Sequence, residues 1–169
     1  MKKVNYLSIT EEVLQQIKSK GAFLVAKSTD DKKINVMTIG WAAIGYMWRK
    51  PIMTVMVRES RFTHCIIEKA SSFTVSIPRD GLEEALSFCG TKSGRDFDKF
   101  KQCKLSVVPA QKVNTPIIDL PGFHFECKIV YKNKMEADFL CKEYREYLYS
   151  DNDYHTLYFG EIVACYKNS

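Results

Sequence analysis

The sequence predicts a mainly β domain with helices between its strands, an α+β fold whose strands form an antiparallel barrel or sandwich. First, 169 residues suffice for one domain with a hydrophobic core and leave little room for a second. Second, 46% of the residues are apolar and 27% are charged, which is typical of a globular protein. Third, short segments rich in Val, Ile, Thr and aromatic residues alternate with turn residues, a pattern that favours antiparallel strands over parallel βαβ units. No linker or low-complexity segment divides the chain, so we expect a single domain over residues 1–169.

A helix is expected to open the fold. Ser8 and Glu11 have the spacing of a capping box, and Gly21 supplies a stop signal. An apolar stripe lies between them at helical spacing, made of Val13, Leu14 and Ile17.

Short strands and helices are expected to follow in turn. The predicted strands are residues 22–27, 34–41, 52–58 and 73–77, with turn residues between them. Three helices interrupt or follow these strands, and each starts after a residue that favours the N-cap position. The predicted helices are residues 61–70 after Ser60, residues 82–88 after Asp80 and residues 95–103 after Ser93.

The last third of the chain predicts two long strands around a helix. Apolar and polar residues alternate from 123 to 131, which indicates a half-buried strand whose polar side, including His124 and Glu126, faces solvent. Residues 136–149 are expected to form a helix. A closing strand is expected over residues 156–166.

Several function classes lack their motifs. No glycine-rich dinucleotide or P-loop sequence is present, and no G-x-S-x-G nucleophile elbow occurs. His64, His124 and His155 have no ligand spacing, and no Cys-x-x-Cys pair exists, so we expect no metal site. The six cysteines are expected to be free thiols that behave as small hydrophobes. Hydrolase and metalloenzyme functions are therefore disfavoured.

The charge pattern favours a small anionic ligand. The net charge of +5 is mild, and five cations cluster between residues 90 and 104, whereas residues 135–161 are acidic. A nucleic-acid binder usually carries a larger basic surface, so we expect no nucleic-acid partner. No apolar run approaches the ~20 residues of a membrane helix, and none follows the first lysines as in a signal peptide. We expect a cytoplasmic protein with no membrane partner.

Two segments could bind a phosphate. Residues 58–64 lie where a predicted strand meets a helix, and a helix N-terminus attracts anions. Hydroxyl and guanidinium donors gather there, namely Arg58, Ser60, Arg61 and Thr63. Residues 90–100 form the second segment, in which two glycines, two hydroxyls and three cations could close over an anion. The alternatives are that Ser60 only caps a helix, that the arginines are solvated, and that the second segment is a turn between helices.

A third segment, residues 35–41, has strand residues with an irregular pattern. Asn35, Thr38 and Gly40 interrupt its apolar alternation, and glycine in a strand often marks the close approach of a ligand or another backbone. A flat ring could lie against such a strand. Trp41 could equally belong to the core.

Taken together, these segments resemble the FMN-binding split-barrel family of flavin reductases, which includes the flavoredoxins. The matching pieces occur in the family's order and cover most of residues 15–166. They are residues 35–41, Lys50-Pro51, residues 57–63, residues 73–78, residues 90–100 and the closing His155 with residues 160–163. The acidic, tyrosine-rich residues 136–153 are less typical of the family.

The resemblance implies a six-stranded antiparallel split barrel that forms a homodimer and binds flavin mononucleotide (FMN) near the subunit interface. By this similarity the ring would lie against Asn35, Thr38, Ile39 and Trp41. The phosphate would be held by Ser60, Arg61 and Thr63, beside Arg58, and Lys99 would reach the phosphate or the ring. The resemblance also implies hydride transfer to the flavin from NAD(P)H, or electron exchange with a redox protein. The cofactor carries that chemistry, so no catalytic residue is assigned.

Two other classes remain open from the residues alone. A non-redox β-barrel module could bind single-stranded nucleic acid or another anionic ligand, for which aromatic residues interleaved with cations on one sheet face are expected. A haem or pyridoxal-phosphate protein could use a similar barrel.

Overall fold

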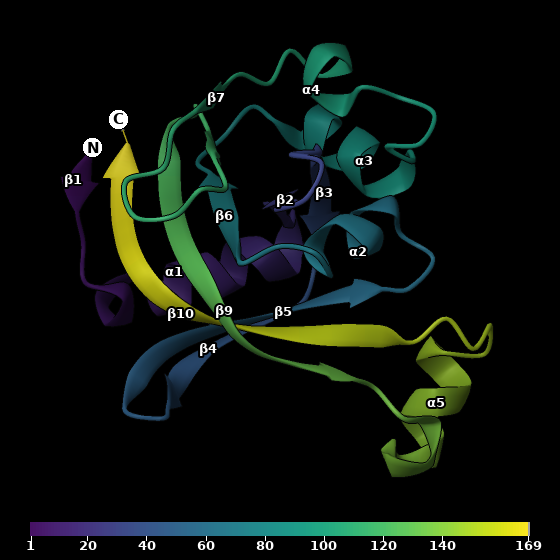
Figure 1. The fold of residues 1–169 in the computed structure, drawn as a ribbon. Coiled ribbons are helices and arrows are strands. Elements are labelled where there is room, and N and C mark those ends of the chain that lie inside the picture. Colours follow the sequence, from purple (N-terminus) through teal and green to yellow (C-terminus); the bar gives the residue numbers. More distant parts are fainter. Residues whose placement is uncertain (169) are drawn as a thin grey trace.

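The computed structural model describes residues 1–168, and its central feature is an antiparallel sheet of eight strands (Figure 1). Seven of them are neighbours in the order β3-β2-β6-β9-β10-β5-β4, and β1 pairs with the end of β10. The strands of this sheet are β1 (Lys2–Lys3), β2 (Ala22–Lys27), β3 (Ile34–Ile39), β4 (Ala42–Met47), β5 (Lys50–Arg58), β6 (Ser72–Pro78), β9 (Gly122–Lys134) and β10 (His155–Asn168). The predicted mainly β, α+β fold with an antiparallel sheet is confirmed.

The sheet has more strands than the six that the resemblance implied. β1 adds two residues at the start of the chain, and β4 forms a hairpin with β5. A further small pair, β7 (Val107–Val108) and β8 (Ile117–Ile118), lies outside the main sheet. The prediction had no strand at β4, because its residues are mostly exposed and its turn uses Trp48 and Arg49 at positive φ rather than glycine.

Helix α1 (Tyr6–Ser19) begins earlier than the capping-box prediction placed it. The N-cap is Asn5, whose side chain accepts a hydrogen bond from the Leu7 N–H, so the predicted cap at Ser8 is wrong. Ser8 instead lies in the first turn and donates to the Asn5 carbonyl. The stop at Gly21 is confirmed by its φ of +88°.

The short helices beside the sheet differ from the prediction at their starts. Helix α2 (Phe62–Ile67) has Arg61 at its N-cap, because the Ser60 side chain is bonded to Asp153 instead. Helix α3 (Glu83–Thr91) is close to the predicted range. Helix α4 (Lys99–Gln102) is shorter than predicted and is capped by the Asp98 side chain, whereas Ser93 caps a separate turn at Arg95.

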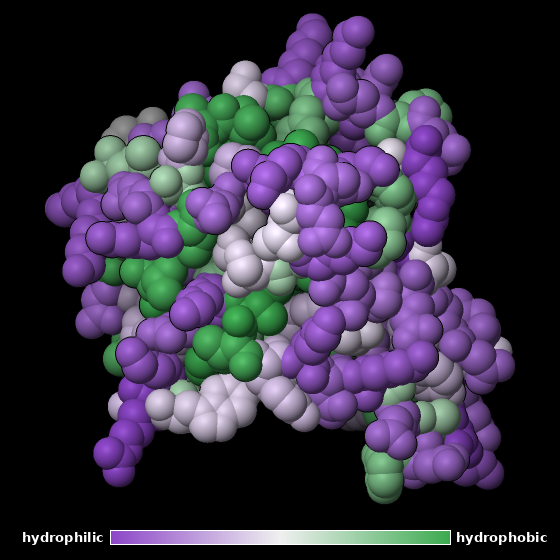
Figure 2. All heavy atoms as spheres, viewed as in Figure 1, coloured by the Kyte–Doolittle hydropathy of each residue, from purple (hydrophilic) through white to green (hydrophobic). Residues whose placement is uncertain are grey.

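Residues 136–153, which we call the acidic segment, do not form one helix. The segment contains a 3₁₀ turn, η1 (Ala137–Phe139), and helix α5 (Lys142–Leu148), with extended backbone at Leu140 between them. Figure 1 shows this segment at the lower right, projecting from the ends of β9 and β10, and Figure 2 shows its surface as mainly hydrophilic. The predicted solvent face of β9 is also wrong at His124 and Glu126, which are both fully buried.

Two hydrophobic clusters fix the position of β3 at the edge of the sheet. The larger cluster packs the α1 stripe of Ile9, Val13 and Ile17 against the inner face of the sheet. The smaller packs Phe23, Val25 and Val36 of β2 and β3 under α3. Strands β2 and β3 are therefore buried on both faces. Helix α3 lies next to β3, where Thr38 Oγ1 donates to the Leu86 carbonyl at 2.6 Å. None of the helices in residues 1–168 has the length and hydropathy needed to span a membrane.

Candidate functional site

A pocket of about 250 Å³ lies between the edge of β3, the end of α3 and the paired ends of β5 and β10. We call it the wide pocket. Its walls are Met37, Thr38, Ile39, Gly40, Trp41, Met56, Arg58, Arg61, Gly90 and His155. Ile39 is buried and Trp41 is exposed, so the β3 side presents backbone and apolar surface to whatever enters.

A second pocket of about 130 Å³ adjoins the first, and Arg61 lines both. We call it the cationic pocket. Its walls are Asn35, Ser60, Arg61, Phe62, Thr63, Thr91, Lys92, Ser93, Gly94, Arg95 and Lys99. Four cations and four hydroxyls converge there, which is the donor set that a phosphate group prefers.

Arg61 and Lys99 are held in place by backbone carbonyls of one turn. Arg61 donates through Nη2 to the Gly90 carbonyl, and Lys99 donates through Nζ to the Cys89 carbonyl at 2.8 Å. Lys99 is only 3% exposed, and this burial lowers the pKa of its ammonium. An anion beside a buried ammonium would recover part of the lost solvation.

The loop after α3 closes tightly over the cationic pocket. Asn35 Nδ2 donates to Thr63 Oγ1 at 2.9 Å, which ties β3 to the start of α2. A Cβ atom at Gly94 would lie 2.4 Å from Asn35 Oδ1, so only glycine permits this approach. Arg95 Nη1 reaches back to the Ser60 carbonyl at 3.1 Å, and its guanidinium lies over the Phe62 ring.

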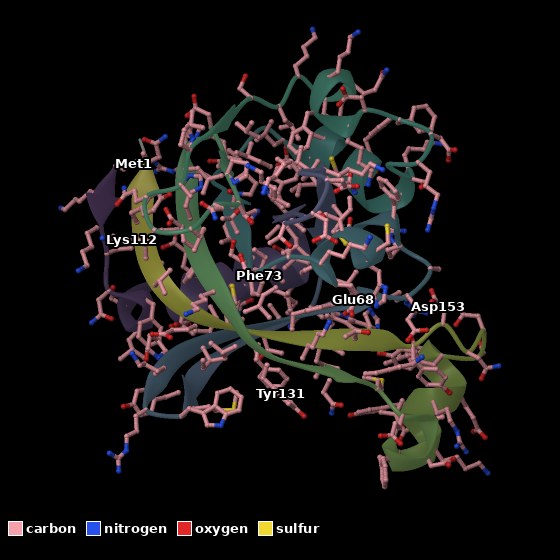
Figure 3. The ribbon with its side chains drawn as sticks, in the orientation of Figure 1. Met1, Glu68, Phe73, Lys112, Tyr131 and Asp153 are labelled. Atoms are coloured by element: carbon pink, nitrogen blue, oxygen red, sulfur yellow. The ribbon has the colours of Figure 1, made fainter. Side chains whose placement is uncertain are left out.

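The acidic segment occupies donors that the sequence assigned to a phosphate. Arg58 Nη2 donates to the Leu148 carbonyl at 2.8 Å, and its Nη1 donates to the Asp153 carbonyl at 2.9 Å. Ser60 donates through Oγ to the Asp153 carboxylate at 2.6 Å. Figure 3 labels Asp153 where this segment meets the end of β5. Arg58 and Ser60 therefore line the pockets with their donors already engaged.

The structure brings all nine predicted residues to these two pockets. Thr38, Ile39, Trp41 and Arg58 line the wide pocket; Asn35, Ser60, Thr63 and Lys99 line the cationic one; Arg61 lines both. The prediction gave His155 no role in the site, although it belongs to the closing segment of the family resemblance. His155 pairs with Arg58 across β10 and β5, and this pairing follows from the sheet register rather than from any local motif.

His155 is an uncharged imidazole on the wall of the wide pocket. Burial, assisted by the nearby Arg58 guanidinium and opposed by the Asp153 carboxylate, lowers its pKa to about 4. The Trp41 ring lies 5.2 Å away, centroid to centroid. The Tyr149 hydroxyl lies 2.7 Å from Nδ1.

This pKa predicts a loss of stability in mild acid. The folded value is depressed from about 6.5, so the unfolded chain binds more protons between the two values. The stability that the neutral His155 ring contributes is fully present above pH ~6.5 and is lost as the pH falls towards about 4. We expect the free energy of unfolding to fall by about 2 kcal/mol from His155 between pH 7.5 and pH 5. Urea unfolding of the wild type and His155→Gln at both pH values measures this difference. Equal pH dependence in the two proteins would contradict it, since buried His124 titrates in both.

The comparison with known families decides what kind of domain carries these pockets. The profile of the flavin reductase-like domain matches residues 16–169, which is most of the chain. This chain belongs to the flavin reductase-like domain family.

Relatives of known sequence or structure are similar over most of this chain. An uncharacterized protein of Archaeoglobus fulgidus is 30% identical over 132 residues, which is 78% of this chain and 64% of that protein. The chain thus spans less than two thirds of that relative. The flavoredoxin of Desulfovibrio vulgaris (Miyazaki F) has a TM-score of 0.68 at 25% identity, over 89% of this chain and 70% of its own. An FMN-binding protein from Thermus thermophilus, solved with p-hydroxybenzaldehyde, has a TM-score of 0.67 at 20% identity, over 88% and 71%.

Proposed function

We propose that the domain is an FMN-binding oxidoreductase that moves hydride or electrons between NAD(P)H, or a protein donor, and an acceptor. One observation carries the proposal: a wide pocket along a strand edge and a phosphate-sized cationic pocket meet at Arg61. FMN has this composition, a flat ring system joined to a single phosphate. The sequence has no glycine-rich dinucleotide loop, which favours FMN over a dinucleotide.

Each pocket has a distinct task in this proposal. Arg61, Thr63 and Lys99 would bind the phosphate, with Arg95 and the loop at Gly94 closing over it. The backbone of β3 at Thr38 and Ile39 would hold the ring, with Trp41 and His155 on the side where a second molecule enters. Arg58 and Ser60 would position the acidic segment beside the pockets rather than bind phosphate directly. Bound FMN supplies the hydride and electron chemistry.

Two roles are compatible with these pockets. A flavin reductase takes hydride from NAD(P)H, whereas a flavoredoxin exchanges electrons with another protein. The similarity to the Desulfovibrio flavoredoxin, at 25% identity, supports electron exchange with a protein, and it leaves hydride transfer from NAD(P)H equally compatible with the pockets. Free thiols at all six cysteines support the cytoplasmic location that we expect for either.

Copurification of FMN tests the cofactor. We expect the purified protein to be yellow and to release FMN, rather than flavin adenine dinucleotide, on denaturation. Chromatography of the released flavin identifies it, and a fluorescence titration of the stripped protein measures its affinity. A colourless protein that leaves the fluorescence of added FMN unchanged would overturn the proposal.

We also propose a homodimer, as the family resemblance implied. Large aromatic residues remain exposed at the tip of the β4–β5 hairpin and on β9, namely Tyr46, Trp48 and Tyr131. Trp48 contacts Tyr131 edge-on at 6.1 Å between centroids, and Figure 3 labels Tyr131 at the lower edge of the sheet. Aromatic residues are enriched in interface cores. Light scattering at micromolar concentration with FMN present should give twice the 19.5 kDa chain mass. A monomeric mass with flavin still bound would contradict this.

A further inference from the structure

The acidic segment contacts His155, a wall residue of the wide pocket, through one buried side chain, Tyr149. Tyr149 directly follows α5 and is only 3% exposed. Its ring stacks on Tyr154 at 5.1 Å between centroids, and the Arg58 guanidinium lies 5.0 Å from its centroid. Arg58 is itself fixed by the carbonyls of Leu148 and Asp153. Both contacts hold the phenol in place.

Tyr149 is the donor in its hydrogen bond with His155, because its hydroxyl has no other acceptor within reach among the described residues. Burial raises the pKa of the Tyr149 phenol, so it keeps its proton at neutral pH. Among residues 1–168 the hydroxyl has no hydrogen-bonding partner other than His155 Nδ1, at 2.7 Å. A buried hydroxyl hydrogen without an acceptor is costly, so Tyr149 donates and Nδ1 accepts. A neutral imidazole that accepts at Nδ1 carries its hydrogen on Nε2.

The Nε2 atom faces open space. All buried side-chain nitrogen and oxygen atoms in residues 1–168 have a hydrogen-bond partner. Within the same residues Nε2 has none, so it is accessible to solvent, although His155 as a whole is only 8% exposed. His155 is one of the residues that line the wide pocket.

We propose that Tyr149 is a positioning residue, which fixes His155 as a neutral Nε2–H donor to a carbonyl oxygen of the molecule that meets the flavin. The identity of that molecule rests on the proposed function, and the positioning does not. Carboxamide, quinone and enone carbonyls belong to the class of acceptors that a fixed, uncharged N–H recognises.

The charges around His155 favour a neutral ligand over an anion. Arg58 from β5 is the cation that faces it, and Asp151 and Asp153 from the acidic segment lie 3.2 and 3.9 Å from Arg58 Nη1. Tyr149 and Trp41, which also contact the His155 ring, carry no charge. The guanidinium of Arg58 already donates to carbonyls and is paired with carboxylates, so it would attract a further anion only weakly. The neutral His155 ring presents an N–H dipole but no charge.

The tautomer of His155 tests the positioning directly. Long-range ¹H–¹⁵N spectra of protein with ¹⁵N-labelled histidine report which ring nitrogen carries hydrogen, and His155→Gln assigns the signals. We expect Nε2–H alone in the wild type and in Tyr154→Phe, which alters the stacked neighbour without touching the bond. We expect Nδ1–H to appear in Tyr149→Phe. An Nδ1–H wild type, or a tautomer that Tyr149→Phe leaves unchanged, overturns the proposal.

Nicotinamide and nicotinate, added to the FMN-loaded protein, test the ligand class. We expect nicotinamide to shift the Nε2–H signal and to bind about tenfold more tightly than nicotinate, with the preference reduced in Tyr149→Phe. Equal binding, or no shift with either probe, overturns the carbonyl assignment. If the protein binds no FMN but shows the Tyr149-dependent tautomer, the proposed function fails while the positioning holds. If it binds FMN but shows the opposite tautomer, the positioning fails while the proposed function holds.

Discussion

Arg61→Ala is expected to weaken FMN binding by about ten- to a hundredfold, because a charge-assisted phosphate contact contributes roughly 1.5–3 kcal/mol. Arg61 is the residue common to both pockets, and its bond to the Gly90 carbonyl holds the guanidinium in place before any ligand arrives. Fluorescence titration of the stripped protein with FMN measures the change. Arg61→Lys should fall between the wild type and Arg61→Ala, since it keeps the charge and loses the planar fork.

The control for this experiment must remove a charge that has no other role. Lys132 is exposed but unsuitable, because its Nζ donates to Glu68 at 2.6 Å. Arg79 is exposed and lies away from both pockets, so Arg79→Ala should leave the affinity within about twofold. Thermal unfolding of each variant without FMN separates affinity from stability. Equal FMN affinities for Arg61→Ala and Arg79→Ala would place the phosphate elsewhere.

That the residues of the cationic pocket lie together could be predicted from sequence, because they are close in the chain. Arg61 and Thr63 lie at a strand-to-helix junction, and Lys99 follows a loop with two glycines. Local spacing therefore identifies them. His155 could not be found in this way, since it reaches the wide pocket by pairing with Arg58, 97 positions earlier in the chain. The engagement of Arg58 by the acidic segment is equally a tertiary effect.

The strands were predictable where burial is simple, and errors arose where a polar residue had a distant partner. β2 was predicted at its observed bounds, because a continuous apolar run indicates burial on both faces. The cap at Ser60 was wrong because Asp153 competes for the same hydroxyl, and no local rule reports a residue 93 positions away. The alternation in β9 predicted one solvent-exposed face. His124 on that face is hydrogen-bonded to Ser76 of β6, and Glu126 accepts a hydrogen bond from the loop at Gln111.

The largest effect on stability is expected at Glu126, which is fully buried in β9. Its carboxylate accepts the backbone N–H groups of Gln111 and Lys112 at 2.7 and 2.6 Å and the Tyr166 hydroxyl at 2.8 Å. Figure 3 labels Lys112 where this loop crosses β9 and β10, on the side of the molecule opposite Asp153. Glu126→Ala removes the buried acceptor that three donors share, so we expect the free energy of unfolding to fall by roughly 3–5 kcal/mol.

Urea unfolding checks this value against two further variants. Glu126→Gln keeps one acceptor oxygen and turns an amide N–H₂ towards a donor, so it should cost roughly 1–3 kcal/mol. Lys128→Ala changes the exposed position two residues along the same strand and should stay within about 0.5 kcal/mol of the wild type. Because the pockets lie at the other side of the sheet, folded Glu126→Gln should still bind FMN with wild-type affinity. If Glu126→Ala and Lys128→Ala unfold at the same urea midpoint, water can replace the carboxylate as the acceptor of the loop N–H groups, and the prediction is wrong.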